Sequence, residues 1–347
     1  YNLPLDDFEL DEEPTTQLRL GIVQSFPRGR TRHYRREQTE WLAISEQASA
    51  ESARRRLVRD VRNSFLELYY QELAESIVTD ARGLFAQLVD ITRSHYASGR
   101  VSQQDVLRSS LELSRLDDRT TRIRNEADRN RAALMKWIGD AAMLPLSRDF
   151  PQLPPLPAKA DLEAALEEHP AIRLETAKIE AENRKVKIAR EQYKPGWSAG
   201  LEYRKRFGED PDGSDRADMM AAMVSLDLPL FPKNRQDRRL AASLQQAEAI
   251  VLSRDDRLRE LQRMLETDYA NWTRLGERAA LYDSQLLQEA AANARASLKA
   301  YRSGVTEFNT LMRARIADLD VRLEALRIRV DRARARANLL YLAGDMP

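Results

Sequence analysis

The chain has 347 residues, of which 32% are charged and 42% hydrophobic, and its mean hydropathy is −0.60. The 56 basic and 55 acidic residues almost cancel. This balance favours solvated helix faces and weighs against nucleic-acid binding, which needs a one-sided basic field. The chain has no cysteine, which excludes disulfides, thiol catalysis and cysteine metal ligands and fits a location in the cell envelope. No apolar run approaches the roughly 18 residues of a membrane-spanning helix. Because the chain starts at Tyr1 and not at methionine, we expect a processed or truncated start.

The first part of the chain predicts one strand and a long helical hairpin. No proline lies between Pro27 and Pro145, and proline would disrupt a helix interior. The predicted elements are an acidic loop over 1–17, an alternating strand at 18–23, a helix over 31–97, a turn at 96–102 and a returning helix over 102–138 that ends at Gly139. The first helix alone would extend over about 100 Å, at about 1.5 Å per residue.

A proline-rich stretch follows, with five prolines between residues 140 and 160, which indicates a linker. Beyond it we expect a short helix over 160–168 and a second helix from His169-Pro170 to Pro195. An alternating strand then begins at Trp197 and is followed by a polar loop at 208–213. A second strand after this loop carries, on one face, Ala222, Val224, Leu226, Leu228 and Leu230. Such strands are long enough to cross a bilayer when tilted, and their alternation is typical of transmembrane β-barrels. A surface hairpin on a soluble sheet would show the same pattern.

The last third of the chain repeats the first hairpin. A proline-free stretch predicts a helix over 233–300, the turn Tyr301–Thr306, and a returning helix that ends at Gly344. The pairs Phe26/Phe231, Tyr96/Tyr301, Gly99/Gly304, Leu134/Leu339 and Gly139/Gly344 share an offset of 205. Aligning the turns needs one gap at Arg100. The strands before Pro27 and Pro232 have opposite parity, so we expect a bulge or a register slip in one copy.

In these motifs and their spacing, the chain resembles the TolC family of outer-membrane efflux channels. The resemblance rests on the two turn motifs, the two helix ends at Gly139 and Gly344, His169-Pro170 and the segment Ala189–Pro195, and it covers nearly all of Leu18–Gly344. It implies a mainly α fold with a small β part, in which duplicated strand–long helix–turn–helix units form an α-barrel and a β-barrel completed by oligomerisation. The domains would be a loop over 1–17, a first repeat over 18–139, an equatorial linker over 140–169, and a second repeat over 170–344 with a β-hairpin at 197–231 and an α-hairpin at 233–343.

The family further implies a homotrimer in the outer membrane with a long periplasmic extension. It would act as a passive exit duct in a tripartite efflux or secretion system, with a periplasmic adaptor and an inner-membrane pump as partners, outer-membrane lipid around its strands and no cofactor. Three groups of site residues follow. The adaptor-docking tips would be Ser98, Gly99, Val101, Ser102, Ser303, Gly304, Val305 and Thr306. The channel entrance would involve Tyr301, Glu307, Asn309 and Met312. The lipid-facing strand residues would be Trp197, Leu201, Tyr203, Val224, Leu226 and Leu228.

One departure from the family pattern and one alternative function stay open at this point. The family's entrance carries aspartates about one turn apart, whereas the matching positions are Asn309 and Met312, so an acidic constriction is in doubt and Met312 could instead be a helix-packing residue. The three histidines are dispersed, without metal-ligand spacing, and His95 is expected on a helix surface. No nucleophile, Walker or glycine-rich phosphate motif is present, so we expect no enzyme. The alternative is a soluble or periplasmic coiled-coil scaffold or adaptor.

Overall fold

The computed structural model describes residues 16–344, which belong to two compact units. One unit combines the chain up to Ala48 with Arg173–Asp256, and the other combines Ser49–Ile172 with the chain from Arg257. The predicted loop over 1–17 lies outside the described residues except for Thr16 and Gln17, and Gln17 already belongs to the first strand.

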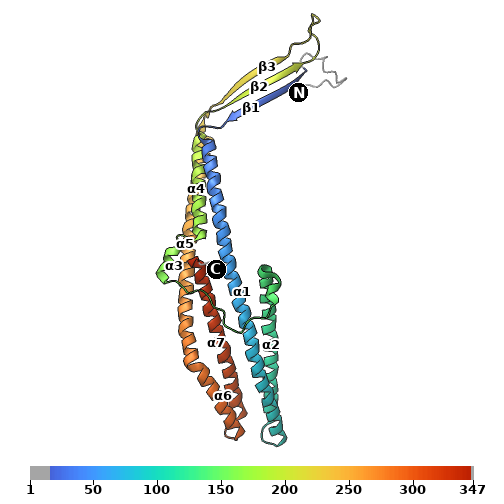
Figure 1. Ribbon diagram of the computed structural model, residues 1–347, viewed down its shortest axis with the longest axis vertical. Coiled ribbons are helices and arrows are strands. Elements are labelled where there is room, and N and C mark those ends of the chain that lie inside the picture. The colour runs from blue at the N-terminus through green and yellow to red at the C-terminus, as the bar shows by residue number, and fades with distance from the viewer. Residues whose placement is uncertain (1–15, 345–347) are drawn as a thin grey trace. The chain divides into compact units, whose positions relative to one another are not determined.

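The first unit contains a three-stranded antiparallel sheet (Figure 1). Its strands are β1 (Gln17–Phe26), β2 (Gly196–Arg206) and β3 (Met219–Asp227), in the order β1-β2-β3. The register is continuous in both pairs, so the predicted bulge or slip within a strand is wrong. The irregularity instead follows β3: the Leu230 N–H bonds back to the Leu228 carbonyl, and Phe231 has φ +59°. Such a tight turn ends the strand four residues before Phe231, so Leu228 and Leu230 lie beyond β3 and not on its face.

The sheet has one apolar and one polar face. Residues directly opposite each other on antiparallel strands share a face, and Phe26, Trp197 and Leu226 lie opposite one another across the three strands. The rings of Phe26 and Trp197 stack with their centroids 3.8 Å apart. The same face carries Leu18, Leu20, Ile22, Ala199, Leu201, Tyr203, Met220, Ala222 and Val224, and most of these large apolar side chains are exposed in the single chain. The other face is more polar: it carries the row Ser25, Ser198 and Ser225 with Arg19, Glu202 and Asp227, and also Val23, Met219 and Met223.

A compact set of polar contacts joins this sheet to the helices at its base. Arg28 pairs with Asp227 at the end of β3 and donates to the Gln192 carbonyl at 2.6 Å. Glu191, at the end of α4 (Pro170–Glu191), accepts from the Arg30 N–H at 2.7 Å and pairs with Lys194. Between them Gly29 has φ +49°, and a Cβ there would lie 1.8 Å from the Glu191 carboxylate. The positive φ favours glycine here, and a larger residue would also displace the Glu191 carboxylate from the Arg30 N–H.

The helices of the two repeats have equal lengths. Helix α1 (Thr31–Ala97) has 67 residues, and its counterpart runs from Gln236 to Arg302, with both ends shifted by 205 positions. The returning helices, α2 (Gln103–Ile138) and α7 (Phe308–Ala343), have 36 residues each and obey the same offset. The gap predicted at Arg100 is therefore wrong, because the two turns contain the same number of residues. The predicted helix over 233–300 is interrupted: α5 (Gln236–Leu281) passes through a π-helical turn, η3 (Tyr282–Leu286), into α6 (Leu287–Arg302).

The linker contains the 3₁₀ turn η1 (Gly139–Met143) and the short helix α3 (Lys159–Ala165), and a further 3₁₀ turn, η2 (Pro232–Asn234), precedes α5. Residues of α3 and the start of α4 pack against α5 and the end of α7 in the second unit, through Leu162, Ile172, Leu265, Leu339 and Leu342. The short helix that follows the proline-rich segment is thus held by apolar contacts to α5 and α7.

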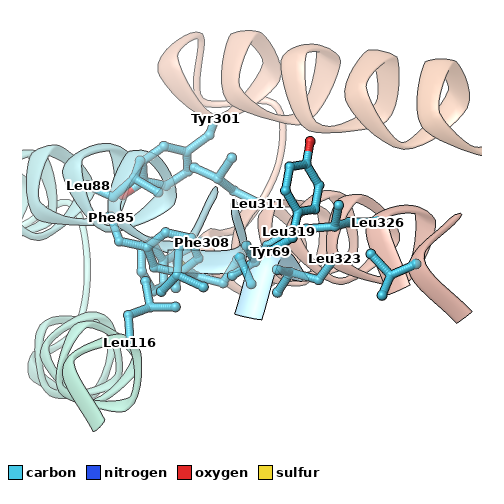
Figure 2. Packing of buried hydrophobic residues seen from close by; sticks show 14 of the residues in the cluster. Tyr69, Phe85, Leu88, Leu116, Tyr301, Phe308, Leu311, Leu319, Leu323 and Leu326 are labelled. Atoms are coloured by element: carbon cyan, nitrogen blue, oxygen red, sulfur yellow. The ribbon is translucent and has the colours of Figure 1, made fainter. Parts of the chain in front are cut away.

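The main core of the second unit joins the two repeats. Tyr69, Phe85 and Leu88 of α1 pack with Leu311, Leu319, Leu323 and Leu326 of α7, and Leu116 of α2 joins them (Figure 2). Polar pairs flank this core: Glu67 of α1 bonds Arg327 at 2.9 Å and Arg334 at 3.1 Å, and Asn63 donates to Asn338 at 2.9 Å. The helical repeats thus form a real tertiary interface within one chain.

Candidate functional site: the paired helical turns

The two helical hairpins turn with the same backbone geometry. At the first turn the Gly99 N–H bonds to the Tyr96 carbonyl at 2.9 Å and the Arg100 N–H to the His95 carbonyl at 2.8 Å. At the second, Gly304 bonds to Tyr301 at 3.1 Å and Val305 to Ala300 at 2.9 Å. This pair of bonds is the Schellman motif, which needs a left-handed residue, and the two glycines have φ +72° and +73°.

At each turn a serine hydroxyl hydrogen-bonds back to main-chain carbonyls of the preceding helix. The Ser98 hydroxyl lies within bonding distance of the Ser94 and His95 carbonyls, and the Ser303 hydroxyl bonds the equivalent Lys299 and Ala300 carbonyls. These carbonyls already accept backbone N–H groups of the turn, so the hydroxyls add a second bond to each of them. The Ser-Gly dipeptides therefore make the turn itself, and their side chains offer little to a partner.

The turns differ where the returning helices start. Ser102 caps α2 through a reciprocal capping box with Asp105. The equivalent position before α7 is Glu307, which makes no side-chain cap bond. Glu307 is exposed, and so is Val305, whose residue surface is 80% accessible. Val101 and Thr306 are half-buried, while Ser98, Gly99, Ser102, Ser303 and Gly304 are exposed. Most of the predicted docking residues thus lie on the surface of the turns.

Two of the predicted entrance residues lie inside the chain. Tyr301 is 6% exposed and packs edge-on against Phe308, and its hydroxyl lies 3.4 Å from His95 Nδ1 (Figure 2 shows Tyr301 directed into the cluster). Burial raises the pKa of Tyr301 above its ordinary value of 10, so this phenol stays protonated at neutral pH. Met312 is 1% exposed and belongs to the same core, which supports its interpretation as a helix-packing residue. Neither side chain borders a surface of the single chain.

The remaining entrance residues are accessible to different degrees. Glu307 is exposed, whereas Asn309 is half-buried, and its Oδ1 is buried without a partner among the described residues. His95 corrects an expectation too: it is half-buried and faces Tyr301, with ring centroids 5.7 Å apart, and so is not a free surface residue. The contact between His95 and Tyr301 joins the first turn to the second. The sequence did not indicate this contact, because the equivalent position of the second repeat is Ala300 and so the repeat does not single out His95.

The register of the sheet shows on which face each of the predicted lipid-facing residues lies. Trp197, Leu201, Tyr203, Val224 and Leu226 share the apolar face, and only Leu228 lies outside the strand. Across residues 16–344, none of the helices has the length and apolarity needed to span a membrane, and no cluster of three or more histidine or acidic side chains could hold a metal ion.

The profile of the outer membrane efflux protein family matches residues 162–345 of the chain, more than half of its length. The chain belongs to this family. It is an outer-membrane efflux channel, as the TolC resemblance predicted. No curated protein matched the chain sequence. Among solved structures, the outer membrane protein VceC of Vibrio cholerae is 16% identical, with a TM-score of 0.81 over 94% of this chain and 79% of that one.

Two further channels share this fold at low identity. The CmeC outer membrane channel of Campylobacter jejuni is 12% identical with a TM-score of 0.82, and the match covers 94% of this chain and 71% of CmeC. The MtrE channel of Neisseria gonorrhoeae, in its open state, is 14% identical with a TM-score of 0.74, over 95% and 80% of the two chains. The fold of the efflux channel family is thus preserved here with almost no sequence identity.

Proposed function

We propose that this efflux channel is a homotrimeric, passive exit duct that receives its substrate from an inner-membrane pump through a periplasmic adaptor. The observation that carries the proposal is the incomplete sheet. Both β1 and β3 are edge strands of a three-stranded sheet whose one face is exposed and apolar. Lipid does not tolerate unpaired backbone groups, so such a sheet must be closed by strands of further copies.

The apolar face of the sheet is proposed to contact lipid and the polar face to line the lumen. Trp197 and Tyr203 on the apolar face suit the aromatic girdles at the two edges of a membrane. In the same framework, residues 18–139 and 170–344 are the two repeats of the domain scheme, with 140–169 as an equatorial linker between them.

The helical turns are proposed as the adaptor-docking sites. They are exposed and held rigidly by their own backbone bonds, and each chain presents two of them with the same geometry. Val305, Thr306 and their counterparts Arg100 and Val101 would then meet a helical hairpin of the adaptor. For the entrance, Glu307 and Asn309 stay candidates, while Tyr301 and Met312 would shape it by packing the turns together.

Native mass measurement of the full chain extracted in detergent tests the proposal, with three chains per particle as the expected result. The chain should also pellet with membranes in the absence of detergent, where a helical scaffold would stay in the supernatant. A stable monomer that retains its strands would overturn the proposal.

A further inference from the structure

A cavity of about 620 Å³ lies between the linker and the helices of the second repeat. Residues 150–153 of the linker form one part of its wall, and α5, the π-helical turn η3 and α7 form the rest. All of these residues belong to the second unit of the chain. The size suits a small organic molecule, because ligand pockets have volumes of about 300–1,000 Å³.

The lining of this cavity carries more positive than negative charge. Among the described residues it includes one acid, Asp283, and three bases from one face of α7, Arg329, Arg332 and Arg336. Asp283 pairs with Arg329 at 2.6 Å. Arg336 donates from Nε to the Pro154 carbonyl at 2.8 Å, and neither Arg336 nor Arg332 has an ion pair within residues 16–344. We call the site the arginine cavity, and its two uncompensated guanidinium groups favour an anion.

The guanidinium group of Arg332 is positioned by packing and not by an acid. It lies over the Trp272 ring, 5.3 Å from the ring centroid, and its Nε is buried without a hydrogen-bond partner in the described part of the chain. Gly276 makes room for it, since a Cβ there would lie 3.1 Å from three atoms of the group. Stacking occupies the flat face of a guanidinium and leaves N–H groups at its edge for a carboxylate. A buried charged donor without a partner is unfavourable, so an anion bound here would stabilise the side chain.

The equivalent positions of the first repeat do not form such a site. At the offset of 205, Arg332 and Gly276 correspond to Ala127 and Gln71, which are both buried. The other two arginines are retained in the first repeat, but there both are paired with glutamates of α1. These pairs are Arg124–Glu75 and Arg131–Glu72. The second repeat has thus gained a guanidinium group and leaves it, together with Arg336, without an acid.

The π-helical turn at the edge of the cavity is a second difference between the repeats. Asp283 of this turn lines the cavity, whereas the equivalent residues 77–81 belong to the regular helix α1. Single π-helical turns inside α-helices occur frequently at functional sites. The irregular turn and the unpaired arginines therefore coincide at one place in the second repeat.

We propose that the arginine cavity binds a small organic carboxylate with an aromatic body. The carboxylate would bind Arg332 and Arg336, which lie one turn apart on α7. The aromatic body would lie against Trp272 and the apolar linker residues Phe150 and Leu153. This site goes beyond the exit duct and does not depend on it, because its lining comes from one unit of one chain.

Calorimetric titration of the purified full chain in lipid nanodiscs tests the proposal, with 1-naphthoate as the ligand. We expect one saturable site per chain. The neutral 1-naphthamide has the same rings without the charge, and it should bind at least about ten-fold more weakly, because charge-assisted hydrogen bonds are about twice as strong as neutral ones. Non-specific partition into lipid would favour the neutral compound, so the comparison separates the two effects.

Variants locate the binding site. Arg332→Gln should weaken the binding of naphthoate about ten-fold or more. The matched control is Arg274→Gln, which removes the same charge from the exposed surface of α5, where Arg274 pairs with Glu277 at 2.9 Å, and it should bind like wild type. The double variant Gly276→Gln, Arg332→Ala installs the residues of the first repeat, so it should lose binding without leaving a packing defect.

Thermal unfolding gives a second measurement. Naphthoate should raise the melting temperature of wild type but not of Arg332→Gln, since a ligand that binds only the folded state stabilises it. The absence of saturable binding, equal affinities for naphthoate and naphthamide, or wild-type affinity in Arg332→Gln would each overturn the site. A monomeric chain that binds naphthoate would overturn the trimer of the proposed function and leave this site in place.

Discussion

At the residue scale, the fold buries the titratable side chain of His169. Its ring is 1% exposed and packs edge-on against Tyr341 with centroids 5.0 Å apart, and its Nδ1 accepts the Ala171 N–H at 3.2 Å. Burial, followed by the positive charges of Arg55 and Arg257, lowers the pKa of His169 from 6.5 to about 4. The sequence predicted a helix start at His169-Pro170, but not the burial, because the residues around His169, among them Tyr341, Arg55 and Arg257, come from three helices far apart in the sequence.

Acidification should therefore destabilise the protein through His169. The group is neutral in the folded state and gains a proton in the unfolded state below pH 6.5, so its contribution is complete above pH 6.5 and is lost as the pH falls towards 4. The loss should reach about 3 kcal/mol, since each pKa unit is worth about 1.4 kcal/mol. The measurement is the melting temperature of the detergent-solubilised protein between pH 8 and 4, for wild type and His169→Asn.

Because carboxylates also titrate at the acid end, the informative quantity is the difference between the two proteins. His169→Asn should lose less stability than wild type over this range. Parallel pH profiles for wild type and His169→Asn would contradict the assignment.

At the scale of the elements, prolines and glycines decided what could be predicted. The bounds of α1 and α2 were predicted to within one residue because Pro27, Gly99 and Gly139 mark their ends. The π-helical turn at Tyr282–Leu286 was not predicted, since it contains neither glycine nor proline and a π turn leaves no periodic signal in five residues. The burial of Tyr301 was equally inaccessible, because it depends on how α6, α7 and α1 meet, whereas the helical periodicity had already offered packing as the alternative interpretation of Met312. The shared apolar face of the strands followed from alternation alone.

The strands allow a sharp test with adjacent residues. Leu226 and Ser225 are consecutive on β3 and point to opposite faces, opposite Trp197 and Ser198. Because Leu226 lies level with Trp197, near the proposed edge of the membrane, arginine at Leu226 should cost up to about 1 kcal/mol, whereas arginine at Ser225 should cost less. Folding into lipid vesicles, followed by urea titration, measures both. Equal losses for Leu226→Arg and Ser225→Arg would refute the assignment of the faces.

At the scale of the whole molecule, rigid turns predict that docking can be separated from assembly. Val305 and Thr306 lie outside α7. The Val305 N–H takes part in the Schellman motif, but any residue other than proline supplies this N–H, and no side chain of the two residues takes part. Glutamate is tolerated before a helix start, where negative charge is favoured. The double substitution Val305→Glu, Thr306→Glu should therefore leave the trimer and its melting temperature unchanged, while export in cells and adaptor co-purification fall.

The matched control for this variant is Arg100→Glu, Val101→Glu, which places the same charges at the equivalent positions of the first turn. If both variants reduce adaptor binding, both turns dock; if only one does, the adaptor distinguishes them. Full export by a chain carrying all four substitutions would leave the turns with a structural role alone.

The construction of these turns also bears on how the channel can evolve. The bend depends on one glycine, two main-chain bonds and a serine hydroxyl that points back into its own helix. The exposed side chains of Arg100 and Val305 are therefore not needed for the bend, and the duplication supplies two such sets of outward positions in one gene. If the turns dock an adaptor as proposed, substitutions in one set can fit a new adaptor while the other set keeps the old one, and neither change disturbs the fold.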